Sequence, residues 1–150
     1  MEKNMSHINL KKDPYSSGYI LDLKMTQISN FSNIFEKIKP SDITELILSY
    51  NSFPIIDPMI SEMRNLRVLN ISVNHLKAIC NLEELHKLES LNLSTNRITM
   101  IENIQNLPKL IRLVVYTLKL NLSIYIGFGN ELYLEMRGIK DPIFKNFEPI

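Results

Sequence analysis

Residues 88–98 read LESLNLSTNRI, and residues 66–76 read LRVLNISVNHL, which is nearly the same pattern one period upstream. Both stretches place apolar residues at the first, fourth, sixth and eleventh places and an asparagine at the ninth. The pattern also begins at residues 43 and 110, so successive copies start 23, 22 and 22 residues apart, with Leu118 at the asparagine place of the last copy. A fixed period of this length indicates a repeat protein.

The spacing of the apolar residues predicts a short strand in each copy. Places four and six lie on one face of such a strand, because strand side chains alternate between its two faces. One unit cannot bury this face alone, but stacked units form a continuous core. After each strand, apolar residues recur at every third place, as at Leu76, Ile79 and Leu82. This pattern favours short helical or 3-10 turns on the outer side.

Polar residues mark the turns of each unit. The asparagine at place nine follows the strand, where its amide can donate to and accept from backbone groups that the turn leaves unpaired. We expect a structural ladder of these residues along the stack: Asn51, Asn74 and Asn96. On the outer side, Asp57 followed by Pro58 fits the start of a helical turn, and Asn81 with Glu84 resembles a capping pair.

Two weaker copies flank the four clear ones. The upstream copy starts at residue 18 and keeps Leu21, Leu23 and Ile28. The downstream copy starts at residue 129 and keeps Leu132, Leu134 and Ile139. Degenerate end units are expected because terminal repeats must close the core. We therefore predict an N-terminal cap or tail in residues 1–17, repeat units in residues 18–128, and a degenerate terminal repeat or C-terminal cap in residues 129–150.

The run of residues 66–110 resembles the leucine-rich repeat superfamily, and more narrowly its intracellular 22-residue subclass, typified by a nuclear regulatory subunit of a protein phosphatase. The resemblance implies an α/β solenoid: a horseshoe segment of about five to six units, with short parallel strands on the concave side and short helical or 3-10 turns on the convex side. It also implies protein binding, usually on the concave strands. The C-terminal cap sequence of that subclass is not recognisable in GFGNELYLEMRGIKDPIF (residues 127–144), and no phosphatase-contacting residues are carried over.

Composition and the scattered reactive residues argue against several functions. A net charge of +1 gives no bulk attraction to nucleic acid or to a membrane surface. The single cysteine, Cys80, allows no internal disulfide, and no apolar run has the length of a signal or a membrane span. His7, His75 and His86 share no metal-ligand spacing. We expect an intracellular protein, cytoplasmic or nuclear, without catalysis, cofactor, metal or small-molecule substrate, in which Cys80 is a partly buried filler.

The concave face, made of places three, five, seven and eight, is the surface that varies between units. Here Met25, Tyr50 and Val73 form an apolar stripe. One interpretation of this stripe is a docking site for a protein. The other is that β-branched and aromatic residues simply favour strands. Arg112 and Arg67 are expected as rim charges. The predicted partner-binding residues are Met25, Ile47, Tyr50, Arg67, Val68, Asn70, Val73, Asn92, Arg112 and Tyr116.

Two functions stay open at this point. The first is a non-enzymatic interaction module that holds a protein of unknown identity on its concave strands. The alternative is a structural or regulatory subunit that packs through its convex side or an open end in a larger assembly. The low-GC composition and divergent ends are compatible with a host-directed protein of a virus or another pathogen. A catalytic effector is disfavoured because no site chemistry is found.

Overall fold

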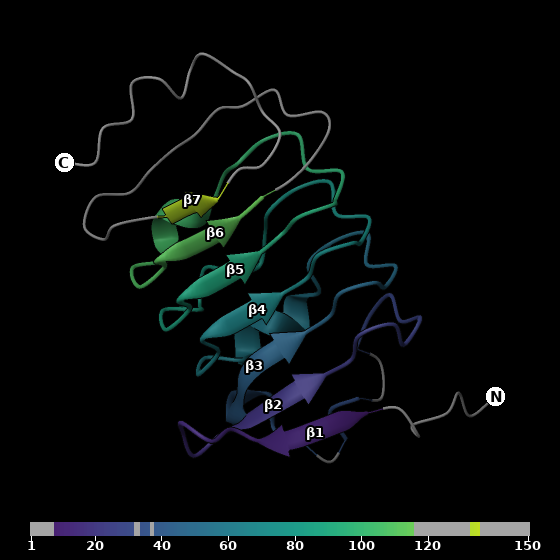
Figure 1. The fold of residues 1–150 in the computed structure, drawn as a ribbon, viewed down its shortest axis with the longest axis vertical. Helices are drawn as coiled ribbons and strands as arrows, with labels where there is room; N and C mark the ends of the chain where they lie inside the picture. Colours follow the sequence, from purple (N-terminus) through teal and green to yellow (C-terminus); the bar gives the residue numbers. More distant parts are fainter. Residues whose placement is uncertain (1–7, 32–33, 37, 116–132, 136–150) are drawn as a thin grey trace.

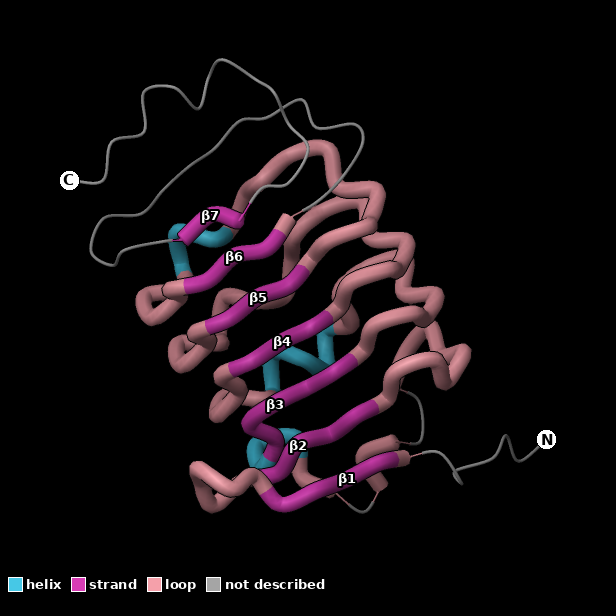
Figure 2. Tube along the Cα trace, in the orientation of Figure 1, coloured by secondary structure: helices cyan, strands magenta, loops and turns pink. Residues whose placement is uncertain are grey.

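The computed structural model describes residues 8–31, 34–36, 38–115 and 133–135 of the 150-residue chain. Its strands form one sheet in chain order, in which β1 runs antiparallel to β2 and every later neighbour is parallel (Figures 1 and 2). The strands are β1 (Asn9–Lys12), β2 (Tyr19–Asp22), β3 (Ile43–Ile47), β4 (Val68–Asn70), β5 (Ser90–Asn92), β6 (Arg112–Val114) and β7 (Tyr133–Glu135).

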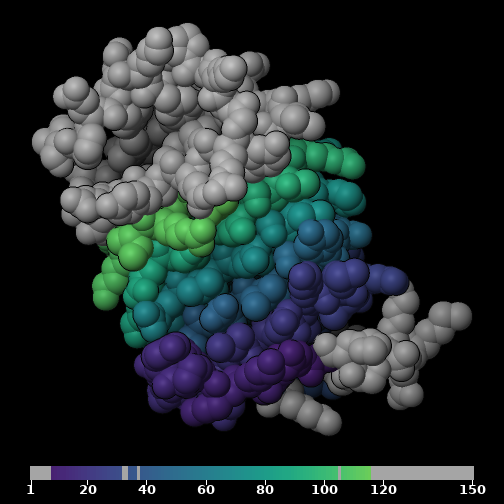
Figure 3. All heavy atoms as spheres, viewed as in Figure 1, coloured from purple at the N-terminus to yellow at the C-terminus, as the bar shows by residue number. Residues whose placement is uncertain are grey.

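The sheet register follows the repeat. The place-four leucines of adjacent strands are register partners and are fully buried in β2 to β6: Leu21, Leu46, Leu69, Leu91 and Leu113. Each parallel strand therefore belongs to one unit, and the units stack in order along the molecule, as the colours of Figure 3 show. The repetition places equivalent side chains of successive units about 4.8 Å apart, the usual distance between paired strands.

The core lies between the sheet and the outer turns. Place-six and outer apolar residues, such as Leu48, Ile71, Ile79 and Leu85, are fully buried beside the place-four leucines. Burial of one such side chain stabilises the fold by about 1.5–3 kcal/mol. No single unit could supply this core, because each apolar row is completed by the next unit.

Short 3-10 helices cover part of the outer side: η2 (Pro40–Asp42), η3 (Pro58–Glu62) and η4 (Ile104–Asn106). The predicted helix start at Asp57 is confirmed, since its carboxylate accepts a hydrogen bond from the backbone nitrogen of Met59 at 2.9 Å. The predicted capping pair of Asn81 and Glu84 is wrong, because residues 81–89 contain turns and bends but no helix. Asn81 has a left-handed backbone with φ of 59°.

The two ends of the sheet differ from the repeat. Within the segment predicted as a cap or tail, β1 pairs with the outer edge of β2 and keeps that edge from being open. At the other end, Leu134 and not Leu132 lies opposite Leu113, so the predicted register of the last unit is wrong by two residues. A shift of two keeps every side chain on its face, and alternation in the sequence therefore cannot detect it.

Candidate functional site

The open face of the sheet carries the side chains of places three and five, and we call it the strand face. Its place-three row is Ile20, Glu45, Val68, Ser90 and Arg112, and its place-five row is Asp22, Ile47, Asn70, Asn92 and Val114. The β2–β4 end is therefore apolar and acidic, with Ile47 and Val68 half-buried. The middle is small and polar, and Arg112 is exposed on β6.

A second row of side chains runs along the end of the strands. This place-eight row consists of Met25, Tyr50, Val73 and Thr95. Backbone hydrogen bonds continue the ladder to it, since the nitrogens of Met25, Tyr50 and Val73 donate to the place-seven carbonyl of the next unit at 3.1, 3.1 and 2.9 Å. Met25 and Tyr50 are 66% and 52% exposed. Three predicted partner-binding residues are thus neighbours in one row.

The place-eight row has an unusual backbone. All four residues are left-handed, with φ of 58°, 59°, 54° and 55° in chain order. For residues other than glycine and asparagine this conformation costs about 1–2 kcal/mol each, because the β-carbon crowds the following carbonyl. It is least favourable for the β-branched Val73 and Thr95. The fold therefore holds these four residues in a conformation that lowers its stability.

The asparagines that follow the place-eight row point the other way. Asn51 and Asn74 are buried, at 8% and 5% exposure. The Nδ2 of Asn74 donates to the carbonyl of Leu48 at 2.9 Å, and its Oδ1 accepts from the nitrogen of Phe53 at 3.0 Å. Asn96 likewise donates to Ile71 and Leu93, at 3.0 Å each. Each amide therefore ties its own unit to the preceding one.

A comparable ladder lies on the outer side, and sequence reasoning missed it. The Nδ2 of Asn81 donates to the carbonyl of Ile56 at 2.6 Å, and that of Asn103 donates to Ile79 at 2.7 Å. Both asparagines are left-handed, with φ of 59° and 62°. Their separation by one period of 22 residues was the available signal.

Asn70 and Asn92, predicted to bind a partner, have local hydrogen bonds on the strand face. The Oδ1 of Asn70 accepts from the nitrogen and the hydroxyl of Ser72, at 3.1 and 2.8 Å. Asn92 accepts from Ser94 in the same way, at 3.0 and 2.6 Å. The side-chain Oδ1 atoms of both asparagines therefore accept hydrogen bonds within the chain. A partner would form its hydrogen bonds with their Nδ2 groups.

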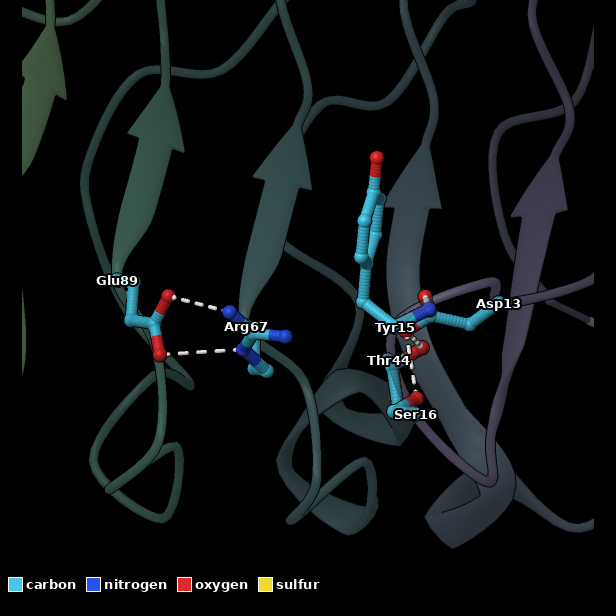
Figure 4. Close-up of polar contacts among 6 residues, drawn as sticks. All are labelled: Asp13, Tyr15, Ser16, Thr44, Arg67 and Glu89. Atoms are coloured by element: carbon cyan, nitrogen blue, oxygen red, sulfur yellow. Dashed lines mark hydrogen bonds and ion pairs between the residues drawn. The ribbon is translucent and has the colours of Figure 1, made fainter.

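Arg67 lies at the other edge, immediately before β4, apart from the place-eight row. Its guanidinium binds the carboxylate of Glu89 through two contacts of 3.1 and 3.0 Å (Figure 4). This hydrogen bonding raises the pKa of Arg67 and lowers the pKa of Glu89. The bidentate pair joins two neighbouring units, so the predicted role of Arg67 toward a partner competes with its role inside the stack.

A hydrogen-bonded loop, residues 13–18, lies beside that pair and was not predicted as a site. The carboxylate of Asp13 accepts hydrogen bonds from the Ser16 hydroxyl at 2.6 Å, the Thr44 hydroxyl at 2.7 Å and the Tyr15 nitrogen at 2.9 Å. These bonds, led by Ser16, lower the pKa of Asp13 to about 2. Tyr15 itself is 88% exposed, and in Figure 4 its ring points along the direction of the strands. The loop therefore presents an aromatic side chain to solvent.

The loop also depends on a close approach of backbone. A β-carbon at Gly18 would lie 2.3 Å from the Thr44 methyl and 2.7 Å from the carbonyl of Asp42. Only glycine fits there, which explains why the first unit departs from an apolar residue at place one.

The remaining predicted residues carry little chemistry. His75 and His86 are exposed, and Cys80 is half-buried against the core. In the part of the chain that the structure describes, no three histidine, cysteine or acidic side chains come together as metal ligands. No helix among the described residues is long and apolar enough to cross a membrane. His7 and Tyr116 lie outside the described residues.

No protein-family model and no curated protein sequence matches this chain. Among solved structures, it is similar to internalin C2 from Listeria monocytogenes, with a TM-score of 0.62 and 24% identity over 78% of this chain and 50% of that one. The fold is a leucine-rich repeat solenoid. The leucine-rich repeat ectodomain of the receptor kinase SOBIR1 from Arabidopsis thaliana is also similar, with a TM-score of 0.44, 19% identity and coverages of 87% and 82%.

The similarity to the internalin C2 structure confirms the predicted fold class. The chain spans about half the length of the internalin C2 structure. Similarity at this level of identity concerns the fold, and the predicted intracellular 22-residue subclass stays a prediction.

Proposed function

We propose that this protein is a non-enzymatic interaction module that binds a partner protein on the strand face and the place-eight row. The observation that carries the proposal is the choice of residues in that row. Met25, Tyr50, Val73 and Thr95 all occupy a backbone conformation that glycine or asparagine would occupy at lower cost. Strain that persists in successive units supports a role for the side chains other than stability.

The chemistry of the row supports a protein partner. Met25 and Tyr50 are large and more than half exposed, and aromatic residues and methionine are enriched at protein interfaces. The ammonium of Lys24 lies 5.2 Å from the ring centroid of Tyr50 in a cation–π contact. Half-buried Ile47 and Val68 on the strand face extend the apolar surface.

A specific observation favours the alternative, in which the protein packs through its outer side. Place thirteen carries Ile55 and Met100, which are 53% and 45% exposed, and the intervening unit has the exposed Ala78 there. These residues recur at one place, and a neighbouring subunit could cover them together. In either case we propose a reducing compartment, supported by the single Cys80.

Paired variants distinguish the two surfaces. The double variant Tyr50→Ala with Val73→Ser should weaken the binding of a captured partner by about 2 kcal/mol or more, which is near thirtyfold in Kd. Ile55→Ser with Met100→Ser and the neutral control His86→Ala with Lys87→Ala should leave the affinity unchanged. Titration calorimetry gives the affinities, and melting curves show that all pairs are folded. Loss of binding only in the Ile55 and Met100 pair would establish the alternative.

A further inference from the structure

The β2–β4 end of the strand face contains a carboxylate, that of Glu45, which has no ion pair among the described residues. Glu45 is only partly exposed between Ile20 and Val68 in the place-three row. Burial raises its pKa, and the carboxylates of Asp13 and Asp22 raise it further. No ion pair of Glu45 or Asp22 is found among the residues that the structure describes.

Two cations near this end are otherwise engaged, and a third, the exposed Lys11 on β1, is the register partner of Ile20 and lies two strands away from Glu45. Arg67, which lies next to Val68, binds Glu89 through both of its contacts. Lys24 places its ammonium over Tyr50. Asp13 has three hydrogen-bond donors of its own. Among the described residues, the carboxylate of Glu45 therefore has no ion pair, and it lies beside the half-buried Ile47 and Val68. A positively charged group of a partner would complement this carboxylate.

We propose that the strand face of β2 to β4 binds an extended segment of a partner protein, in which a lysine or arginine pairs with Glu45 and Asp22 and an apolar side chain contacts Tyr50. This inference rests on the proposed function and names the chemistry of its partner. Glu45 is already partly desolvated in the free protein, so its pairing requires less additional loss of hydration than that of a fully exposed carboxylate.

The geometry of one unit restricts the spacing in that segment. Glu45 and Tyr50 are five residues apart, which corresponds to at most about 16 Å of extended chain. A partner segment that runs along β3 would therefore place its cation and its apolar residue about four to five residues apart. Tyr15 is exposed near the start of the strands. In the proposed complex the partner's lysine or arginine binds at this end, and the Tyr15 ring can contact the aliphatic part of its side chain.

The test uses a displayed library of random linear peptides of about twelve residues, long enough to cover this distance. Peptides selected on the full chain should be enriched in lysine or arginine four to five residues from an aromatic or aliphatic residue. Their affinity should fall at least about tenfold on Glu45→Gln with Asp22→Asn. The matched control, Glu62→Gln with Glu83→Gln, removes two exposed charges from the outer side and should keep full affinity.

Each contrary result has its own meaning. A pool without basic enrichment, an empty pool, or equal binding to both charge pairs overturns the inference. If the selected peptides lack basic enrichment or bind both charge variants equally, but no longer bind Tyr50→Ala with Val73→Ser, the proposed function stands and only the assignment of a basic partner fails. If the peptides bind all these variants equally, the strand face is not the binding surface.

Discussion

Two sets of positions share the left-handed backbone conformation, but different types of residue occupy them. On the outer side, Asn81 and Asn103 have φ of 59° and 62°, and each donates a hydrogen bond to the preceding unit. At the strand ends, the place-eight row has φ of 54–59° but carries methionine, tyrosine, valine and threonine. Asparagine tolerates this conformation well, whereas bulky and β-branched residues do not.

The difference separates residues that stabilise the stack from residues that do not. The outer asparagines relieve strain and also satisfy a carbonyl, so stability alone explains them. The place-eight residues do neither, and Met25 and Tyr50 leave most of their surface in water. The comparison therefore supports a role of the place-eight side chains in binding rather than in stability.

Replacing an outer asparagine should give the largest effect. Asn81→Val adds a β-branched residue to a left-handed site and removes the 2.6 Å hydrogen bond to the carbonyl of Ile56. We expect a loss of about 2–3 kcal/mol in the free energy of unfolding, measured by chemical denaturation. The control Asn81→Gly removes only the hydrogen bond and should cost about 1 kcal/mol. Equal losses for both variants would show that the conformation itself carries no cost.

The reverse exchange at place eight should have the opposite sign. Val73→Asn relieves the left-handed strain and should raise the free energy of unfolding by about 1 kcal/mol. The same change at Val68, which is also half-buried but lies in β4, should lower it, because asparagine is disfavoured in strands. A lower midpoint for Val73→Asn in a denaturant titration would mean that valine is the better residue there, and the comparison would fail.

The smallest effect is expected at Glu45 and depends on pH. The fold raises the pKa of Glu45 through burial and through Asp13 and Asp22, so ionised Glu45 lowers the stability of the folded state. This loss is present at neutral pH and disappears as the pH falls below the ordinary carboxyl range, about pH 4. Glu45→Gln should therefore raise the Tm at pH 7 and leave it unchanged near pH 3.5. An exposed control, Glu83→Gln, should change neither value, and a lower Tm for Glu45→Gln at pH 7 would contradict the assignment.

The stack and its register could be predicted because the same pattern of apolar residues recurs in several copies. Leu46, Leu69 and Leu91 occupy the same place in three copies, and burial on one face requires that they align. The antiparallel β1 could not be predicted in this way, since Asn9–Lys12 belongs to no copy of the pattern. The two-residue shift that places Leu134 opposite Leu113 was not detected, because the alternation of side chains has a period of two and is unchanged by such a shift.

The candidate site was only partly accessible from the sequence. Place eight was identified as a variable position, and the neighbourhood of Met25, Tyr50 and Val73 followed from the repeat. Their left-handed backbone could not be read from those residue types, which normally avoid it. Pairing between units, as in Arg67 and Glu89, was also missed, because it depends on side-chain reach across strands rather than on spacing along the chain.

The most direct test of the central claim is a footprint of the bound partner. A benzophenone photocrosslinker replaces Met25, which is exposed in the place-eight row, or His86, which is exposed on the outer side. After irradiation of the complex, crosslinked product is quantified by gel and mass spectrometry. The account predicts a crosslink to the partner from position 25 and none from position 86. A crosslink from position 86 with none from position 25 would contradict it.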